Sequence, residues 1–187
     1  MRTFIAVDLP DRFCNKISEI QKELKKSGAD IKFVDPEKVH FTMKFLGDIN
    51  QGKVDSIRKS LKEISNDIDS FKSSVEGLGV FPNFDYIKVV WIGVDRGKKG
   101  FLELNNYIED EMSKLGFERE DRDFVPHATI GRVKSGKNKD NLIETIKKDE
   151  GIYFGEIEVE KVKLKKSKLK PQGPEYSDLV EVELGAG

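Results

Sequence analysis

The 187-residue sequence predicts an α+β fold with two pseudo-symmetric lobes, each an antiparallel sheet with helices packed on its outside, around a central cleft. Two observations support this prediction. Helical periodicity and strand-like alternation follow one another along the whole chain, and each half contains one strand of the form apolar, His, any residue, Thr, apolar. Because a chain of this length can build one shared core, we expect residues 1–187 to form a single two-lobed domain.

The first half alternates strands with two amphipathic helices. The run RTFIAVDL is expected to form the opening strand, and the following helix over residues 11–28 has apolar side chains spaced four, three and four residues apart. A second helix carries apolar residues from Val54 to Ile64. The other expected strands are residues 31–34, 39–47, 70–80 and 86–94. The last two should pair as a hairpin, because the turn-like segment FPNFD separates them.

The second half repeats this kind of order. A helix is expected over residues 101–115, and Gly116 ends it. The strand candidate FVPHATIGRV, residues 124–133, comes next, and a short helix containing Leu142 and Ile146 follows. Two late strands, near residues 153–165 and 179–184, complete the prediction.

Composition limits the classes of function. Lysine and arginine number 33 and aspartate and glutamate 34, so the net charge of −1 gives no global attraction to nucleic acid or to a membrane. The single Cys14 excludes an internal disulfide and leaves too few thiols for a structural zinc site. The apolar N-terminal run is too short for a signal sequence or a membrane span. We therefore expect a cytoplasmic protein with no membrane partner.

The two histidines of the chain stand in matching motifs. His40 is followed two residues later by Thr42, and His127 by Thr129. With four threonines in 187 residues, both coincidences together have a chance of roughly 1 in 2,000. On a strand, a spacing of two places ring and hydroxyl on the same face. In the first motif, alternation also predicts an apolar core face made of Val39, Phe41, Met43 and Phe45.

Paired imidazoles and hydroxyls suit the opening of a cyclic phosphodiester. That reaction needs a base for the attacking water and an acid for the departing sugar oxygen. Two imidazoles with a pKa near ~6.5 can hold opposite protonation states at neutral pH. Threonine hydroxyls can donate hydrogen bonds to the phosphate oxygens as charge develops on them. Such a site requires no metal ion and no cofactor.

The motifs VHFTMKFLG and FVPHATIGRV resemble the signatures of the 2H phosphoesterases. Over its whole length the chain is similar to the bacterial and archaeal RNA 2',3'-cyclic phosphodiesterases, first known as 2'-5' RNA ligases. The resemblance implies hydrolysis of a terminal 2',3'-cyclic phosphate to a 2'-phosphate, with 2'-5' ligation as the reverse reaction. It also implies that His40 is the proton donor, His127 the proton acceptor and Arg132 a phosphate-binding residue beside Thr42 and Thr129.

Regular alternation places Arg132 on the face opposite His127, so its role requires a bulge or bend near Gly131, or action from elsewhere. Lys44 shares the face of His40 and either helps to neutralise a phosphate or reaches solvent. Tyr176 either stacks on a terminal base or packs in the protein. The lysine-rich run from Lys161 to Lys170 either guards a sheet edge or forms an electrostatic groove for RNA.

Other functions remain open from the sequence. A related enzyme could act on small cyclic nucleotides or on 2'-5' oligonucleotides, and a non-catalytic RNA-binding protein could have the same fold. The presence of two complete motifs favours catalysis, because binding alone does not require two proton carriers. We therefore expect a monomeric phosphodiesterase whose partner is RNA with a 2',3'-cyclic phosphate end.

Overall fold

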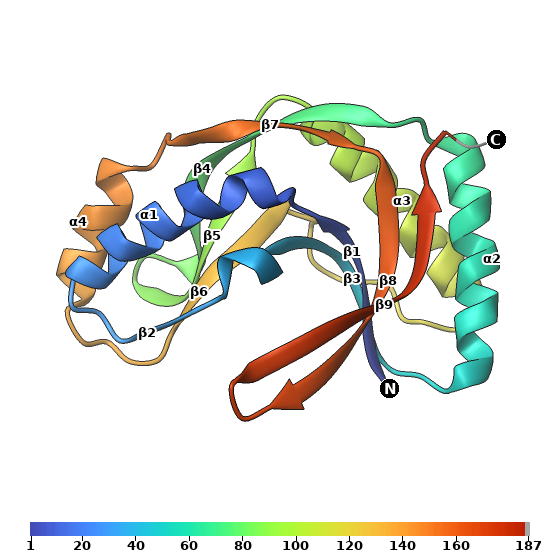
Figure 1. Ribbon diagram of the computed structural model, residues 1–187, viewed down its shortest axis with the longest axis horizontal. Helices are drawn as coiled ribbons and strands as arrows, with labels where there is room; N and C mark the ends of the chain where they lie inside the picture. The colour runs from blue at the N-terminus through green and yellow to red at the C-terminus, as the bar shows by residue number, and fades with distance from the viewer. Residues whose placement is uncertain (186–187) are drawn as a thin grey trace.

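The computed structural model describes residues 1–185, which form one large antiparallel sheet and four α-helices (Figure 1). The strand order is β7-β4-β5-β6-β3-β1-β8-β9, and the short strand β2 pairs with β6 outside this path. The strands are β1 (Arg2–Asp8), β2 (Ile31–Phe33), β3 (His40–Asp48), β4 (Phe71–Asn83), β5 (Tyr86–Val94), β6 (His127–Val133), β7 (Tyr153–Val159), β8 (Lys161–Lys170) and β9 (Gly173–Glu183). The helices are α1 (Cys14–Lys26), α2 (Gln51–Asp67), α3 (Lys98–Lys114) and α4 (Lys139–Lys148). The α+β class predicted from the sequence is confirmed.

The strand order is symmetric about the junction between β3 and β6. Moving outward, β1, β8 and β9 follow β3, while β5, β4 and β7 follow β6. We call these groups the β3 lobe and the β6 lobe. One residue pair, Phe41 with Ala128, connects the lobes, so the two expected sheets join edge to edge. The β3 lobe takes strands from both ends of the chain.

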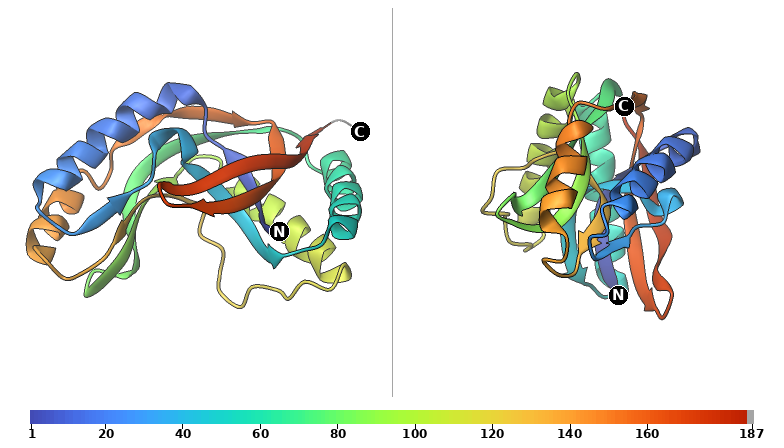
Figure 2. Two further views of the ribbon diagram at one scale, coloured as in Figure 1. Left: turned by 60° about the horizontal axis from the view of Figure 1, so that its bottom comes forward. Right: turned by 90° about the vertical axis from the view of Figure 1, so that its left-hand side faces the viewer.

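The helices bury one face of the sheet. In the β3 lobe the ring of Phe101 on α3 lies 4.9 Å from that of Phe41. In the β6 lobe Gln21 of α1 donates a hydrogen bond of 3.1 Å to the Ile130 carbonyl. Because cross-strand neighbours such as Phe41 and Ala128 point to the same side, α1 and α3 cover the same face. Figure 2 shows α1 and α4 at one end of the molecule and α2 and α3 at the other.

The late strand expected over residues 153–165 is wrong, because two strands occupy this segment. β7 pairs with β4 at one edge of the sheet, and β8 pairs with β1 in the other lobe. The chain passes from one lobe to the other at Glu160. The sequence contains the signal for this break: the buried Val159 and Val162 are three residues apart, so strand alternation does not continue across Glu160.

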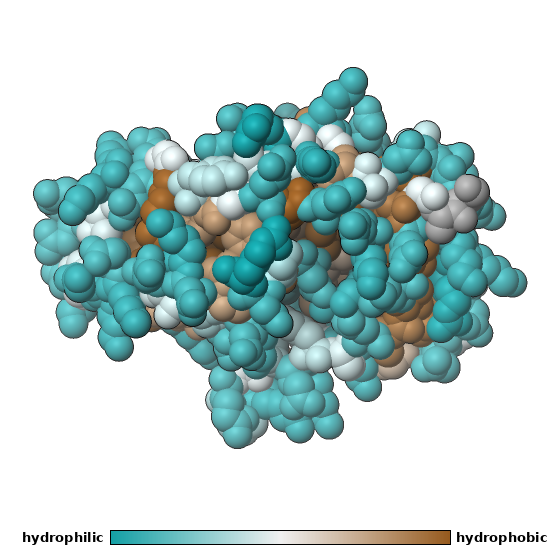
Figure 3. Space-filling model, turned by 45° about the horizontal axis from the view of Figure 1, so that its top comes forward, coloured by the Kyte–Doolittle hydropathy of each residue, from teal (hydrophilic) through white to brown (hydrophobic). Residues whose placement is uncertain are grey.

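The surface is mostly hydrophilic. On the face seen in Figure 3, apolar patches are interrupted by polar and charged side chains. Within residues 1–185, no helix is both long enough and apolar enough to cross a membrane.

Candidate active site

The two histidine strands contain a β-bulge at the same place relative to the histidine. The register of β3 against β1 skips Met43, and the register of β6 against β5 skips Ile130. Each skipped residue lies three positions after its histidine, His40 or His127. A bulge reverses the alternation of the residues that follow it. The residue five positions after each histidine therefore returns to the histidine's face.

In β6 this position is Arg132, whose side chain is exposed. The sequence left two explanations open for Arg132: a bulge or bend near Gly131, or action from elsewhere. The strand register shows that β6 contains the bulge. In β3 the corresponding residue is Phe45, and its predicted place on the apolar core face is wrong. Phe45 is 65% exposed, and its ring lies 6.1 Å from that of Phe4. The matching bulges thus present a cation on β6 and an aromatic ring on β3.

The bulge also turns Lys44 away from His40, so both sequence interpretations of this lysine are wrong. Lys44 is only 6% exposed and lies against α3. Its Nζ donates to both carboxylate oxygens of Glu109, at 3.0 and 2.9 Å, and to the Glu118 carbonyl at 2.8 Å. Lys44 therefore joins β3 to α3 and to the loop that precedes His127.

The four motif side chains point to the face that the helices leave free. Phe41 and Ala128, whose side chains are buried, are paired across the junction. In an antiparallel ladder the flanking positions set His40 across from Thr129, and Thr42 across from His127. The structure thus brings both predicted motifs to one junction.

Each imidazole is held in the same way. Nδ1 of His40 lies 2.7 Å from the Lys38 carbonyl, and Nδ1 of His127 lies 2.7 Å from the Val125 carbonyl. Since a carbonyl only accepts, Nδ1 of each ring must donate, and Nε2 is the nitrogen left to exchange a proton. Nε2 of His40 lies 3.1 Å from the Thr42 hydroxyl.

Aromatic side chains support both rings. Phe4 stacks on His40 with ring centroids 5.0 Å apart, and Tyr176 meets His40 edge-on at 5.3 Å. Around His127, Phe81 lies at 4.7 Å and Trp91 at 5.9 Å. Tyr176 therefore packs against His40, as one of the two sequence interpretations expected.

Burial lowers the pKa of both histidines, and the carbonyls of Lys38 and Val125 oppose this effect. The positive charge of Arg132 lowers the pKa of both histidines as well. The site therefore favours neutral imidazoles when it is empty, and an anionic phosphate bound beside them would raise both pKa values.

A square of four charged side chains adjoins His40. Lys163 and Lys165 on β8 each contact both Asp8 and Asp178, and all four distances are 2.9 Å. Asp8 is the register partner of His40 on β1. The charge of Lys165 lowers the pKa of His40, whereas that of Asp8 raises it. Sequence analysis missed this square, because residues 8 and 178 are far apart in the chain.

The part of the chain described by the structure contains no group of three or more His, Cys, Asp or Glu side chains that could hold a metal ion.

Comparison with known proteins places this chain in a family. The model of the LigT-like phosphoesterases matches the chain twice, over residues 7–91 and 92–176. The RNA 2',3'-cyclic phosphodiesterase of Methanothermobacter thermautotrophicus is 42% identical over 179 residues, which cover 96% of each chain. The enzyme of the same name from Methanocaldococcus jannaschii is 40% identical, covering 97% of this chain and 99% of its own.

Solved structures agree with the fold. The TT0787 protein of Thermus thermophilus superposes with a TM-score of 0.82 at 26% identity, covering 99% of this chain and 98% of its own. LigT of E. coli complexed with 3'-AMP superposes with a TM-score of 0.74 at 22% identity, covering 98% and 97%. The two matched halves, each with one histidine motif, show that the chain belongs to the LigT-like phosphoesterase family.

Proposed function

We propose that this protein is an RNA 2',3'-cyclic phosphodiesterase that hydrolyses a terminal 2',3'-cyclic phosphate to a 2'-phosphomonoester. The observation that carries the proposal is the matched anchoring of the two imidazoles, each through Nδ1 to the carbonyl two residues upstream. This leaves Nε2 of each ring to exchange a proton, which suits one proton acceptor and one proton donor. The names of the relatives support the same activity.

In the proposed reaction His127 Nε2 takes a proton from water while the water oxygen forms a bond to phosphorus. The bond from phosphorus to the 3' oxygen breaks, and that oxygen receives the proton carried by Nε2 of His40. The hydroxyls of Thr42 and Thr129 donate hydrogen bonds to the non-bridging oxygens, and Arg132 balances their charge. The proposed reaction uses neither metal nor cofactor. With the 5'-hydroxyl of a second RNA in place of water, the same proton transfers would form a 2'-5' linkage, and their reversal would cleave it.

The pKa values of the empty site are compatible with these roles. Burial, and then the charges of Lys165 and Arg132, lower the pKa of His40, which is unfavourable for a proton donor in the free protein. The negative charge of the bound phosphate opposes both effects, so substrate binding favours the protonated form of His40. His127 must be neutral to act as the base, and burial favours that form.

Phe45 supports a nucleotide substrate. Its exposed ring lies on the same face as His40, beside Phe4. An exposed aromatic ring next to a phosphate site can stack on the base of the terminal nucleotide. We further propose that residues 1–187 act as one domain, as a monomer, and in the cytoplasm.

The test uses purified protein in EDTA and an RNA oligonucleotide with a 2',3'-cyclic end. The expected product is a 2'-phosphate, identified by chromatography against 2'- and 3'-phosphate standards. His40→Ala and His127→Ala should each reduce kcat by about 10²- to 10⁴-fold with little effect on RNA binding. Absence of turnover with this RNA contradicts the proposal, and turnover only of cyclic mononucleotides or 2'-5' oligonucleotides assigns one of the alternative activities. RNA binding with no turnover of any of these substrates assigns a non-catalytic role.

A further inference from the structure

The end of the β8-β9 hairpin projects from the body of the protein as a two-stranded ribbon (Figure 1). β8 pairs with β1 only as far as Ser167, and beyond it β8 and β9 pair only with each other. We call residues 168–175 the arm. Lys168, Leu169 and Lys170 are exposed, and Leu169 is 72% exposed. A two-stranded ribbon outside the sheet adds little to the stability of the fold, and its exposed side chains are accessible to a ligand.

Charge divides the lysine-rich run of β8 into two parts. Lys161, Lys163 and Lys165 are paired with carboxylates of Asp8, Asp178 and Glu181. Towards the tip, Lys168 has no carboxylate within 4.0 Å among residues 1–185, and Lys170 only approaches Glu175 at 3.9 Å. Positive charge is therefore neutralised beside His40 and free along the arm.

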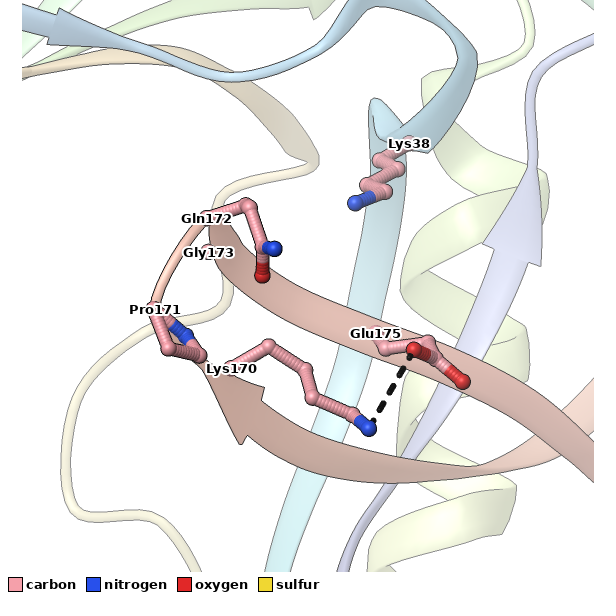
Figure 4. A pocket seen from close by; sticks show the side chains of 6 residues that line it. All are labelled: Lys38, Lys170, Pro171, Gln172, Gly173 and Glu175. Atoms are coloured by element: carbon pink, nitrogen blue, oxygen red, sulfur yellow. Dashed lines mark ion pairs between the residues drawn. The ribbon is translucent and has the colours of Figure 1, made fainter.

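Lys38 connects the arm to the candidate active site. Its Nζ donates a hydrogen bond of 2.9 Å to the Pro174 carbonyl on the arm. Its own carbonyl accepts the Nδ1 hydrogen of His40 at 2.7 Å. Lys38 and the tip of the arm line a shallow pocket, shown in Figure 4; its other residues are Lys170, Pro171, Gln172, Gly173 and Glu175.

We propose that the arm and Lys38 bind the RNA strand on the 5' side of the cyclic phosphate. This inference rests on the proposed function, because the 3' end is then fixed at the histidines and the strand can continue only from its 5' side. Lys38, Lys168 and Lys170 complement the phosphates of the preceding nucleotides, and exposed Leu169 offers them an apolar contact. The substrate is accordingly an oligonucleotide rather than a cyclic mononucleotide.

The test compares two substrates, a cyclic mononucleotide and an oligonucleotide of about eight nucleotides with the same 3' end. In the arm variant, Lys168 and Lys170 are each replaced by glutamine. We expect its kcat/KM for the oligonucleotide to fall on the order of tenfold, with kcat/KM for the mononucleotide unchanged. The salt dependence should become less steep by about 0.7 for each phosphate that the variant no longer neutralises.

The matched control replaces Lys59 and Lys62, exposed lysines of α2, by glutamine. This variant should keep the kcat/KM of the wild type for both substrates. Equal activity of the wild type and the arm variant towards the oligonucleotide would overturn the role of the arm. Binding of an oligonucleotide that ends in a 2'-phosphate, measured by fluorescence anisotropy, tests the arm without turnover. If the wild type hydrolyses neither substrate, the proposed function fails, and this binding measurement alone decides for or against the arm.

Discussion

Replacing Lys44 by methionine should destabilise the protein strongly, because it leaves the carboxylate of Glu109 buried without its cation. The side chains are 4% and 11% exposed, and the lysine makes three hydrogen bonds. Breaking a buried ion pair from one side costs about 3–5 kcal/mol. An unfolding entropy of ~2.1 cal/mol/K per residue converts this cost into a fall in Tm of about 8–13 °C for the 187-residue chain.

Calorimetry or thermal unfolding followed by circular dichroism measures this change. The double variant Lys44→Met/Glu109→Gln removes both charges and should recover at least half of the lost Tm, since no uncompensated charge remains. Lys114→Met, which removes the exposed partner of Glu111, is the control and should leave Tm nearly unchanged. A single variant as stable as the wild type, or a double variant no more stable than the single one, would refute the reasoning.

Three further predictions concern the candidate active site. Activity should be lost as pH falls through the pKa of His127, which must be neutral, and as pH rises through the pKa of His40, which must be protonated. Because both values are lowered, kcat/KM should be bell-shaped with its maximum below pH 6.5, and a profile rising steadily to alkaline pH contradicts this. Asp8→Asn should lower the pKa of His40 and Lys165→Met should raise it, with His127 unchanged; nitrogen NMR can follow both rings separately because the chain has only two histidines. Unchanged titration of His40 in both variants would contradict the effect of Asp8 and Lys165 on its pKa. Arg132→Ala should reduce kcat by about 10²- to 10³-fold, with partial recovery in Arg132→Lys, which cannot make a bidentate contact; activity near that of the wild type in Arg132→Ala would exclude the role.

The sequence predicts most of the elements because their periodicity is local. Helices with apolar residues at spacings of three and four occur close to where they were expected, and the hairpin of β4 and β5 pairs as predicted. The late strand was wrong because its two parts pair with strands in different lobes, β4 and β1. The break in alternation at Glu160 marks where the segment divides, but a local pattern does not show which distant strands each part pairs with. The square around Lys165 could not be predicted for the same reason.

Side-chain direction was the other source of error. Counting alternate residues from His40 assigned Lys44 and Phe45 to the wrong faces, because one extra residue in a strand reverses all later positions. The same count left Arg132 in doubt. Pairing with the neighbouring strand determines where a bulge occurs, and one strand read alone does not contain that information.

The two bulges give a physical reason why the halves of the site are alike in construction and different in chemistry. Each half supplies a histidine, a threonine two residues later, an extra residue and then a side chain returned to the same face. In β3 that side chain is Phe45, which suits a base, and in β6 it is Arg132, which suits a phosphate. A symmetric backbone therefore presents an asymmetric surface. The cyclic end of an RNA is itself asymmetric, with a base on one side of the ribose and a phosphate on the other. We therefore propose that this difference would orient such a substrate and thereby distinguish the donor and acceptor roles proposed for two histidines with equivalent anchors.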